Sequence, residues 1–217
     1  MTLPGAVAPF RQPVADGGAD LWEMSYKDIQ HMTDGSHFAR ATFSGGCFWC
    51  LQPPFDTLDG VVATVVGYAG GCKTDPVHED VAAGRTGHAL AVQVLYDSGR
   101  IDYGQLLDVF WHNIDPTLPN RQFCVTGAQY RTAIFYHDET QKHLAEASKQ
   151  ALAGSQRFAK RIVTRISPLV MFYRAEECHQ HFYRTHALRY RLCRAACGRT
   201  QRLRELWGTL LRHHGSR

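Results

Sequence analysis

Apolar residues recur along the chain at two spacings, and each spacing predicts a different kind of element. Four segments are β-branched or alternate apolar with polar side chains, which is typical of strands: 38–43, 61–66, 89–96 and 131–136. Helical spacing marks 103–112, and Asp138 and Gly154 bracket a second helix over 138–152. Because strands and helices mix without regular βαβ alternation, the pattern indicates an α+β fold.

Proline and short apolar runs shape the remaining expected elements. A helix is expected to begin at Cys47, and Pro53 and Pro54 should shorten, kink or restart it, since proline lacks a backbone donor. A pair of strands and then a helix are expected over 162–166, 169–173 and 175–186.

The chain is expected to divide into three regions. An irregular arm rich in Gly, Ala, Asp and Pro occupies 1–36, and a catalytic α+β domain occupies 37–188. The tail over 189–217 is rich in arginine and contains a short helix. One face of that helix carries an apolar stripe, formed by Leu203, Leu206, Trp207, Leu210 and Leu211.

Composition narrows the class of protein. A net charge of +4 over 217 residues is too small to indicate nucleic-acid binding. No apolar run approaches the roughly 20 residues of a membrane span, and the first residues lack the basic and apolar regions of a secretory signal. Seven cysteines cannot all pair within one chain. We therefore expect a cytoplasmic protein with reduced thiols, no membrane partner and no nucleic-acid partner.

The run Gly45-Gly46-Cys47-Phe48-Trp49-Cys50 is the strongest candidate site. A thiol at a helix start feels the partial positive charge of unpaired N–H groups, which favours the thiolate. The two glycines allow a tight turn and leave room for a ligand. Phe48 and Trp49 can wall an apolar pocket, so a nucleophilic Cys47 beside a hydrophobic cup is predicted.

Cys47 and Cys50 also form a C-x-x-C pair, for which three interpretations stay open. The pair can be a thioredoxin-like dithiol, although its intervening residues are bulky. It can be half of a zinc site completed by Cys193 and Cys197, although that spacing is loose. Cys50 can also be an auxiliary thiol on the same helix. We expect no metal and no cofactor.

Five short motifs occur in order: Gly46-Cys47-Phe48-Trp49, Gly67-Tyr68-Ala69-Gly70-Gly71, Gly87-His88-Ala89, Gly127-Ala128-Gln129-Tyr130-Arg131 and Cys197-Gly198-Arg199. Together they resemble the peptide methionine sulfoxide reductase A family over about residues 38 to 208. The resemblance implies a two-layer α+β sandwich with a mixed sheet. It also implies reduction of a methionine (S)-sulfoxide, in a peptide or a small molecule, with thioredoxin or a similar dithiol as the reductant.

The resemblance also implies roles for individual residues. The Cys47 thiolate attacks the sulfoxide sulfur and becomes a sulfenic acid, while Phe48 and Trp49 hold the S-methyl group. The sulfenic acid is resolved to a disulfide, for which Cys197, Cys193 and Cys50 are the candidates.

The chain departs from the family at the positions that supply acid groups. Leu90 stands where the family has a glutamate, Val125 where it has an aspartate, and His78 where it has a tyrosine. Tyr130 remains. A positioned acid accelerates such a step by about 10²–10⁴. A phenol with a pKa near 10 is a weak substitute, whereas histidine changes charge between about pH 5 and 8 and can donate. Leu90 and Val125 are therefore expected to make the substrate pocket drier.

Three functions follow from these residues. The first is a sulfoxide reductase acting through Cys47. The second is a repurposed enzyme that uses the thiol and the aromatic pocket for another step on a small biosynthetic molecule. The third is a non-enzymatic redox sensor or thioether-binding module.

Overall fold

The computed structural model describes residues 37–208. Eight strands are present in this part of the chain: β1 (Phe38–Gly45), β2 (Val61–Ala69), β3 (Ala89–Asp97), β4 (Arg121–Gln122), β5 (Val125–Thr126), β6 (Thr132–Tyr136), β7 (Arg165–Pro168) and β8 (Phe172–Arg174). The α-helices are α2 (Phe48–Asp56), α3 (His78–Ala82), α4 (Tyr103–His112), α5 (Glu139–Gly154), α6 (Phe182–Thr185), α7 (Ala187–Ala196) and α8 (Arg199–Trp207). Two 3₁₀ turns, η1 (Ala128–Tyr130) and η2 (Glu177–His179), complete them.

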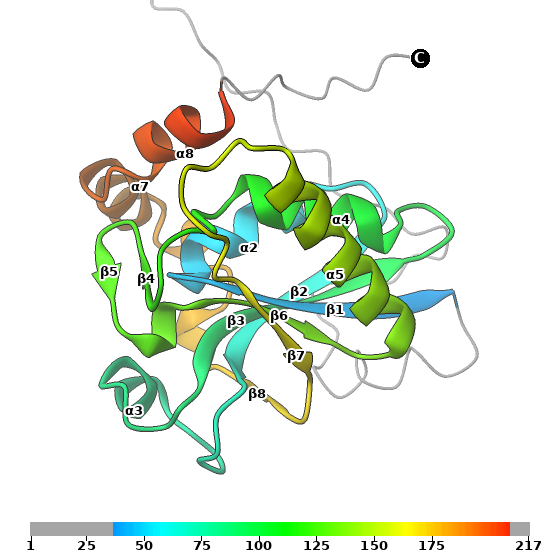
Figure 1. The fold of residues 1–217 in the computed structure, drawn as a ribbon. Coiled ribbons are helices and arrows are strands. Elements are labelled where there is room, and N and C mark those ends of the chain that lie inside the picture. The colour runs from blue at the N-terminus through cyan, green and yellow to red at the C-terminus, as the bar shows by residue number, and fades with distance from the viewer. Residues whose placement is uncertain (1–36, 209–217) are drawn as a thin grey trace, which may run out of the picture.

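Six strands form one mixed sheet in the order β7-β6-β1-β3-β2-β8, in which only β6 and β7 pair in parallel. Helices α2, α4 and α5 cover one face of this sheet (Figure 1). The main apolar core lies in that layer, around the stacked rings of Phe43, Phe55 and Phe110. The predicted α+β sandwich with a mixed sheet is confirmed.

The expected pairing of 162–166 with 169–173 is wrong. β7 pairs with β6 and β8 pairs with β2, at opposite ends of the strand order. The link of three residues between them spans at most about 14 Å, so the sheet must curl until its edges approach. The curled face encloses a second apolar cluster of eight buried residues, four of which are alanines and two of which are Phe135 and Phe172.

The helix expected over 175–186 is also broken. The side chain of Gln180 accepts a hydrogen bond from the Val66 N–H at 3.0 Å and donates to the Val66 carbonyl at 2.9 Å. These bonds tie Gln180 to the edge of β2, and His181 follows with a φ of 47°. Only η2 and α6 form in this segment, because long-range bonds to the sheet compete with local helical ones.

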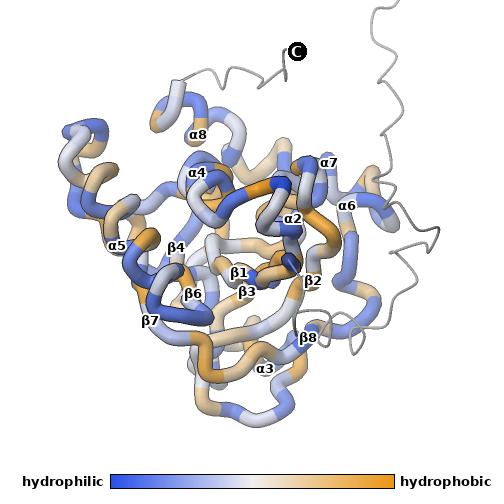
Figure 2. Tube along the Cα trace, turned by 90° about the vertical axis from the view of Figure 1, so that its right-hand side faces the viewer, coloured by the Kyte–Doolittle hydropathy of each residue, from blue (hydrophilic) through white to orange (hydrophobic). Residues whose placement is uncertain are grey.

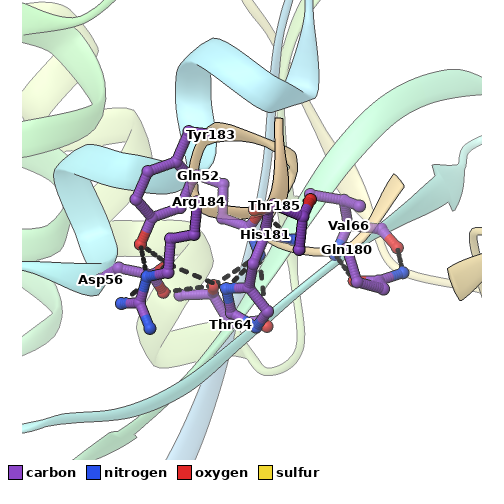
Figure 3. Close-up of polar contacts among 9 residues, drawn as sticks. All are labelled: Gln52, Asp56, Thr64, Val66, Gln180, His181, Tyr183, Arg184 and Thr185. Atoms are coloured by element: carbon purple, nitrogen blue, oxygen red, sulfur yellow. Dashed lines mark hydrogen bonds and ion pairs between the residues drawn. The ribbon is translucent and has the colours of Figure 1, made fainter. Parts of the chain in front are cut away.

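A buried polar network joins α2 to α6, with Asp56 at its centre (Figure 3). The Asp56 side chain is only 2% exposed. It accepts hydrogen bonds from the Thr64 hydroxyl and, at 2.6 Å, from the Tyr183 hydroxyl. Gln52 extends the network by accepting the His181 N–H at 3.1 Å. α2 stays continuous through Pro53 and Pro54, and the network fixes its far end.

The tail folds as α7 and α8, and Figure 2 places α6 and α7 next to α2. Leu203 is buried, and the Trp207 indole N–H donates to the Ile114 carbonyl at 3.2 Å. The expected arm at 1–36, and Leu210 and Leu211 of the expected stripe, lie outside the described residues. Across residues 37–208, no helix has both the length and the hydropathy to cross a bilayer.

Candidate active site

The site is built on the turn between β1 and α2. Gly46 has a φ of 86°, a conformation that side chains rarely adopt. A Cβ there would also lie 2.6 Å from the Cβ of Gln122 on β4. Glycine therefore lets the chain turn and lets the β4–β5 hairpin pack against it. Cys47 follows as the N-cap residue of α2, and it is half-buried.

Cys47 and Cys50 act as one ionising unit. The thiols share a hydrogen bond, which lowers the pKa of Cys50 to about 6 against the opposing effect of burial. The charges of Arg199 and Arg194 lower it further. The same hydrogen bond and burial raise the pKa of Cys47, although the N–H groups of Trp49 and Cys50 act the other way. The pair thus carries one negative charge at neutral pH, and passing the shared proton to Cys50 creates the Cys47 thiolate.

An aromatic wall stands directly after Cys47. Trp49 stacks on Phe182, with ring centroids 3.9 Å apart, and lies 5.6 Å from the ring of His179. The rings of His78 and His179 are 4.2 Å apart, and both approach Phe48. Burial and then the neighbouring His78 lower the pKa of His179. The structure therefore places His78 beside Phe48 and Trp49, so these three predicted site residues lie together.

Two polar atoms of this wall are buried without a hydrogen-bond partner among the described residues. They are the indole Nε1 of Trp49 and Nδ1 of His179. Buried polar groups are nearly always paired, so unpaired ones mark a place for a ligand atom. The sequence interpretation missed His179, because its place beside His78 and Trp49 depends on tertiary contacts that the helix expected over 175–186 does not indicate.

The polar edge of the site is formed by a carboxylate that the sequence interpretation also missed. Glu176 accepts hydrogen bonds from the Tyr68 hydroxyl and from the His78 N–H, each at 2.7 Å. Burial opposes ionisation, but these two bonds lower the pKa of Glu176. Glu176 is therefore a carboxylate that joins β2 to α3, and it does not replace the missing proton donor.

Leu90 and Val125 occupy different surroundings. Leu90 is 2% exposed, lies opposite Tyr68 in the β2–β3 pairing, and belongs to the same apolar core as Phe48. Val125 is half-buried on the β4–β5 hairpin. Tyr130, on η1, packs against that core. Burial, followed by the charges of Cys47 and Cys124, raises the pKa of Tyr130, which keeps its phenol neutral.

The tail places its two cysteines differently. Cys197 is half-buried at the end of α7 and donates to the Arg194 carbonyl at 3.2 Å, whereas Cys193 is exposed one turn earlier. Cys124 is an exposed residue on the β4–β5 hairpin, and burial of its thiol and then the nearby Cys197 raise the pKa of Cys124. Within residues 37–208, no group of three or more His, Cys, Asp or Glu side chains is arranged to hold a metal ion.

The fold and site define a class of protein: a mixed α+β domain with a paired-thiol centre at a helix N-terminus and an aromatic wall beside it. The family model described as "Peptide methionine sulfoxide reductase" matches residues 39–211. The MsrA of Halalkalibacterium halodurans is 46% identical over 169 residues, which cover 78% of this chain and 96% of that protein. The MsrA of Bacillus subtilis is 47% identical over 168 residues, covering 77% and 95%. The chain belongs to the peptide methionine sulfoxide reductase family.

Solved structures give the same result for the fold. The methionine sulfoxide reductase A of Corynebacterium diphtheriae aligns with a TM-score of 0.63 at 30% identity, covering 70% of this chain and 76% of that one. Reduced Mxr1 of Saccharomyces cerevisiae aligns with a TM-score of 0.63 at 32% identity, covering 68% and 85%. The resemblance predicted from the five motifs is confirmed.

Proposed function

We propose that this protein reduces methionine sulfoxide, in a peptide or as a small molecule, through the Cys47 thiol. The observation that carries the proposal is the placement of Cys47. It caps α2, shares a proton with Cys50, and is followed by an aromatic wall containing two unpaired buried polar atoms. Such a wall suits a methyl thioether, and the unpaired atoms suit the oxygen of a sulfoxide.

The chemistry balances with the two thiols as the source of electrons and one proton from a neighbouring acid. The Cys47 thiolate attacks the sulfoxide sulfur, which forms an S–S bond, and the oxygen takes a proton. The hydroxyl is then transferred to the Cys47 sulfur as the S–O and S–S bonds break, so that the thioether leaves and Cys47 becomes a sulfenic acid. The Cys50 sulfur attacks the sulfenic sulfur and releases water, which forms a Cys47–Cys50 disulfide. One proton of the released water comes from the thiol pair and the other from the acid group that donates to the oxygen, and the two thiols supply both electrons.

The oxygen needs a donor while the S–O bond breaks, and Leu90 cannot supply one. Tyr130 keeps its proton and can donate a hydrogen bond. The Trp49 N–H is unpaired, and it can do the same. His78, paired ring to ring with His179, is the group that can deliver a proton. We assign the donor role to these side chains together, with His78 as the acid.

Recycling requires an external dithiol, and thioredoxin is the reductant that the family resemblance implies. Cys50 is the nearest resolving thiol, because it is already hydrogen-bonded to Cys47. Cys197 and Cys193 remain proposed as the thiols that take over the disulfide before the external dithiol reduces it. The cytoplasmic location remains a prediction from the sequence.

One observation favours a second function. Leu90 lies in the same apolar core as Phe48, so a buried aliphatic side chain stands where the family has a carboxyl group. Such a pocket suits a more apolar small molecule, on which the same thiol pair would act without strong acid assistance.

The test is methionine formation from each epimer of methionine sulfoxide in the presence of dithiothreitol. The expected result is turnover of the S epimer that Cys47→Ser abolishes and that Cys72→Ser, at an exposed cysteine, leaves intact. Turnover that survives Cys47→Ser would refute the mechanism. Failure of the wild type on both epimers, with turnover appearing in Leu90→Glu/Val125→Asp, would favour the second function.

A further inference from the structure

Cys124 occupies the tip of the short β4–β5 hairpin. Gln122 pairs with Val125, so Phe123 and Cys124 form a loop of two residues. Phe123 has a φ of 50°, which is a strained conformation for a bulky residue. The guanidinium of Arg199 lies 4.6 Å from the centre of the Phe123 ring and stabilises this turn. A strained turn held by a buried cation is typical of a functional position.

The hairpin is fixed to the Cys47 turn. Gln122 is fully buried and contacts Gly46 so closely that a Cβ there would clash. Its side chain accepts the Asp115 N–H at 2.9 Å and donates to the Asp115 carbonyl at 2.7 Å. Cys124 is therefore carried by a rigid element next to the thiol pair.

Cys197 is held in place by the packing of the tail helices. It stands between α7 and α8, and α8 is anchored by an ion pair of 2.8 Å between Arg202 and the buried Asp115. Arg199 donates to the Asn113 carbonyl. Asp115 thus anchors both the hairpin and α8, and the Cys197 thiol lies close enough to the Cys124 thiol to raise the pKa of Cys124. Cys50 is close enough to Cys124 for its charge to act on that thiol.

We propose that Cys124 and Cys197 form a second disulfide, which accepts the oxidation from the Cys47–Cys50 disulfide and presents it at the surface to the external reductant. The inference rests on the proposed function, because sulfoxide reduction is what oxidises the first pair. Cys124 is the central carrier, since it lies in contact with Cys197 and near Cys50. Its exposure gives a reductant access that the buried Cys50 denies.

Two thiol–disulfide exchanges complete the transfer without another oxidant. The Cys124 thiolate attacks the Cys50 sulfur, the Cys47–Cys50 bond breaks, and Cys47 leaves as a thiolate. The Cys197 thiolate then attacks the Cys124 sulfur, and Cys50 leaves. Cys124 and Cys197 give up two protons and two electrons, and Cys47 and Cys50 regain the dithiol state. Cys50 is a good leaving group because its pKa is low.

The test counts methionine formed by fully reduced protein without any reductant. One disulfide per chain gives one equivalent, whereas transfer to a second disulfide frees Cys47 for another turnover. We expect about two equivalents from the wild type and from Cys72→Ser, and about one from Cys124→Ser and Cys197→Ser. Circular dichroism of each variant checks that it folds.

In this count, either two equivalents from Cys124→Ser or one equivalent from the wild type overturns the inference. Peptide mapping gives an independent readout after treatment with stoichiometric hydrogen peroxide, which oxidises Cys47 directly. We expect a Cys124–Cys197 disulfide, and a Cys193–Cys197 disulfide in its place would also overturn the inference. If the wild type makes no methionine but the Cys124–Cys197 disulfide forms with peroxide, the proposed function fails and the relay stands.

Discussion

Replacing Cys47 with alanine should return the Cys50 thiol toward ordinary behaviour. The pKa of Cys50 is lowered from its usual 9.0 to about 6. At 1.36 kcal/mol per unit, that difference favours the thiolate by about 4 kcal/mol. The hydrogen bond from Cys47 is the largest cause, while burial acts against it. Three causes together lower the pKa by at least three, and the bond is the largest of them, so removing it should raise the pKa of Cys50 by at least about 1, or about 1.4 kcal/mol.

The measurement is the rate at which iodoacetamide alkylates Cys50, followed on its peptide by mass spectrometry between about pH 4 and pH 10. In the wild type the rate should rise with pH through about 6, because the thiolate fraction grows there. In Cys47→Ala the rise should move to higher pH, and in Cys72→Ala it should not move. A midpoint that stays in place without Cys47 would show that the two thiols do not share a proton.

Three further predictions concern the acid, the wall and the fold. Leu90→Glu should raise the single-turnover rate on methionine sulfoxide by about 10-fold or more, and an unchanged rate would show that position 90 does not face the oxygen. His78→Phe should lower that rate, whereas Cys72→Ser should not; an unaltered rate in His78→Phe would exclude His78 as the acid. Asp56→Ala should cost about 3 kcal/mol in urea unfolding, because the Thr64 and Tyr183 hydroxyls and the His181 ring lose their partner; a loss near zero would contradict the network.

The parts of the fold that sequence reasoning predicts are those encoded by neighbouring residues. The central strands β1, β2 and β3 and the helices α4 and α5 follow from local periodicity. The Cys47 turn follows from its two glycines, since a positive φ and a close approach both require glycine. These features need no knowledge of the rest of the chain.

The missed features depend on distant contacts. β7 and β8 look like one hairpin in sequence, yet each pairs with a different edge of the curled sheet. η2 forms because Gln180 bonds to Val66 instead of continuing a helix. Periodicity carries no information about such partners.

The same reason separates the predicted site from the observed one. Cys47, Phe48, Trp49 and Cys50 are adjacent in sequence and lie together in the structure. His179 and Cys124 join them only through tertiary packing, and a lone histidine or cysteine in a loop gives no signal of its role. Cys124 could be noticed in sequence only as the neighbour of Val125.

Arg199 is fully enclosed by the protein, and the negative charge of the Cys50 thiolate is what offsets its isolation from water. When the two thiols join, that negative charge vanishes and the guanidinium stays. A buried cation without its counter-charge is costly, so oxidation of the first pair should loosen the docking of α8 and make the disulfide a stronger oxidant. Arg199, two residues after Cys197, would then stabilise the reduced form of the Cys47–Cys50 pair relative to its disulfide.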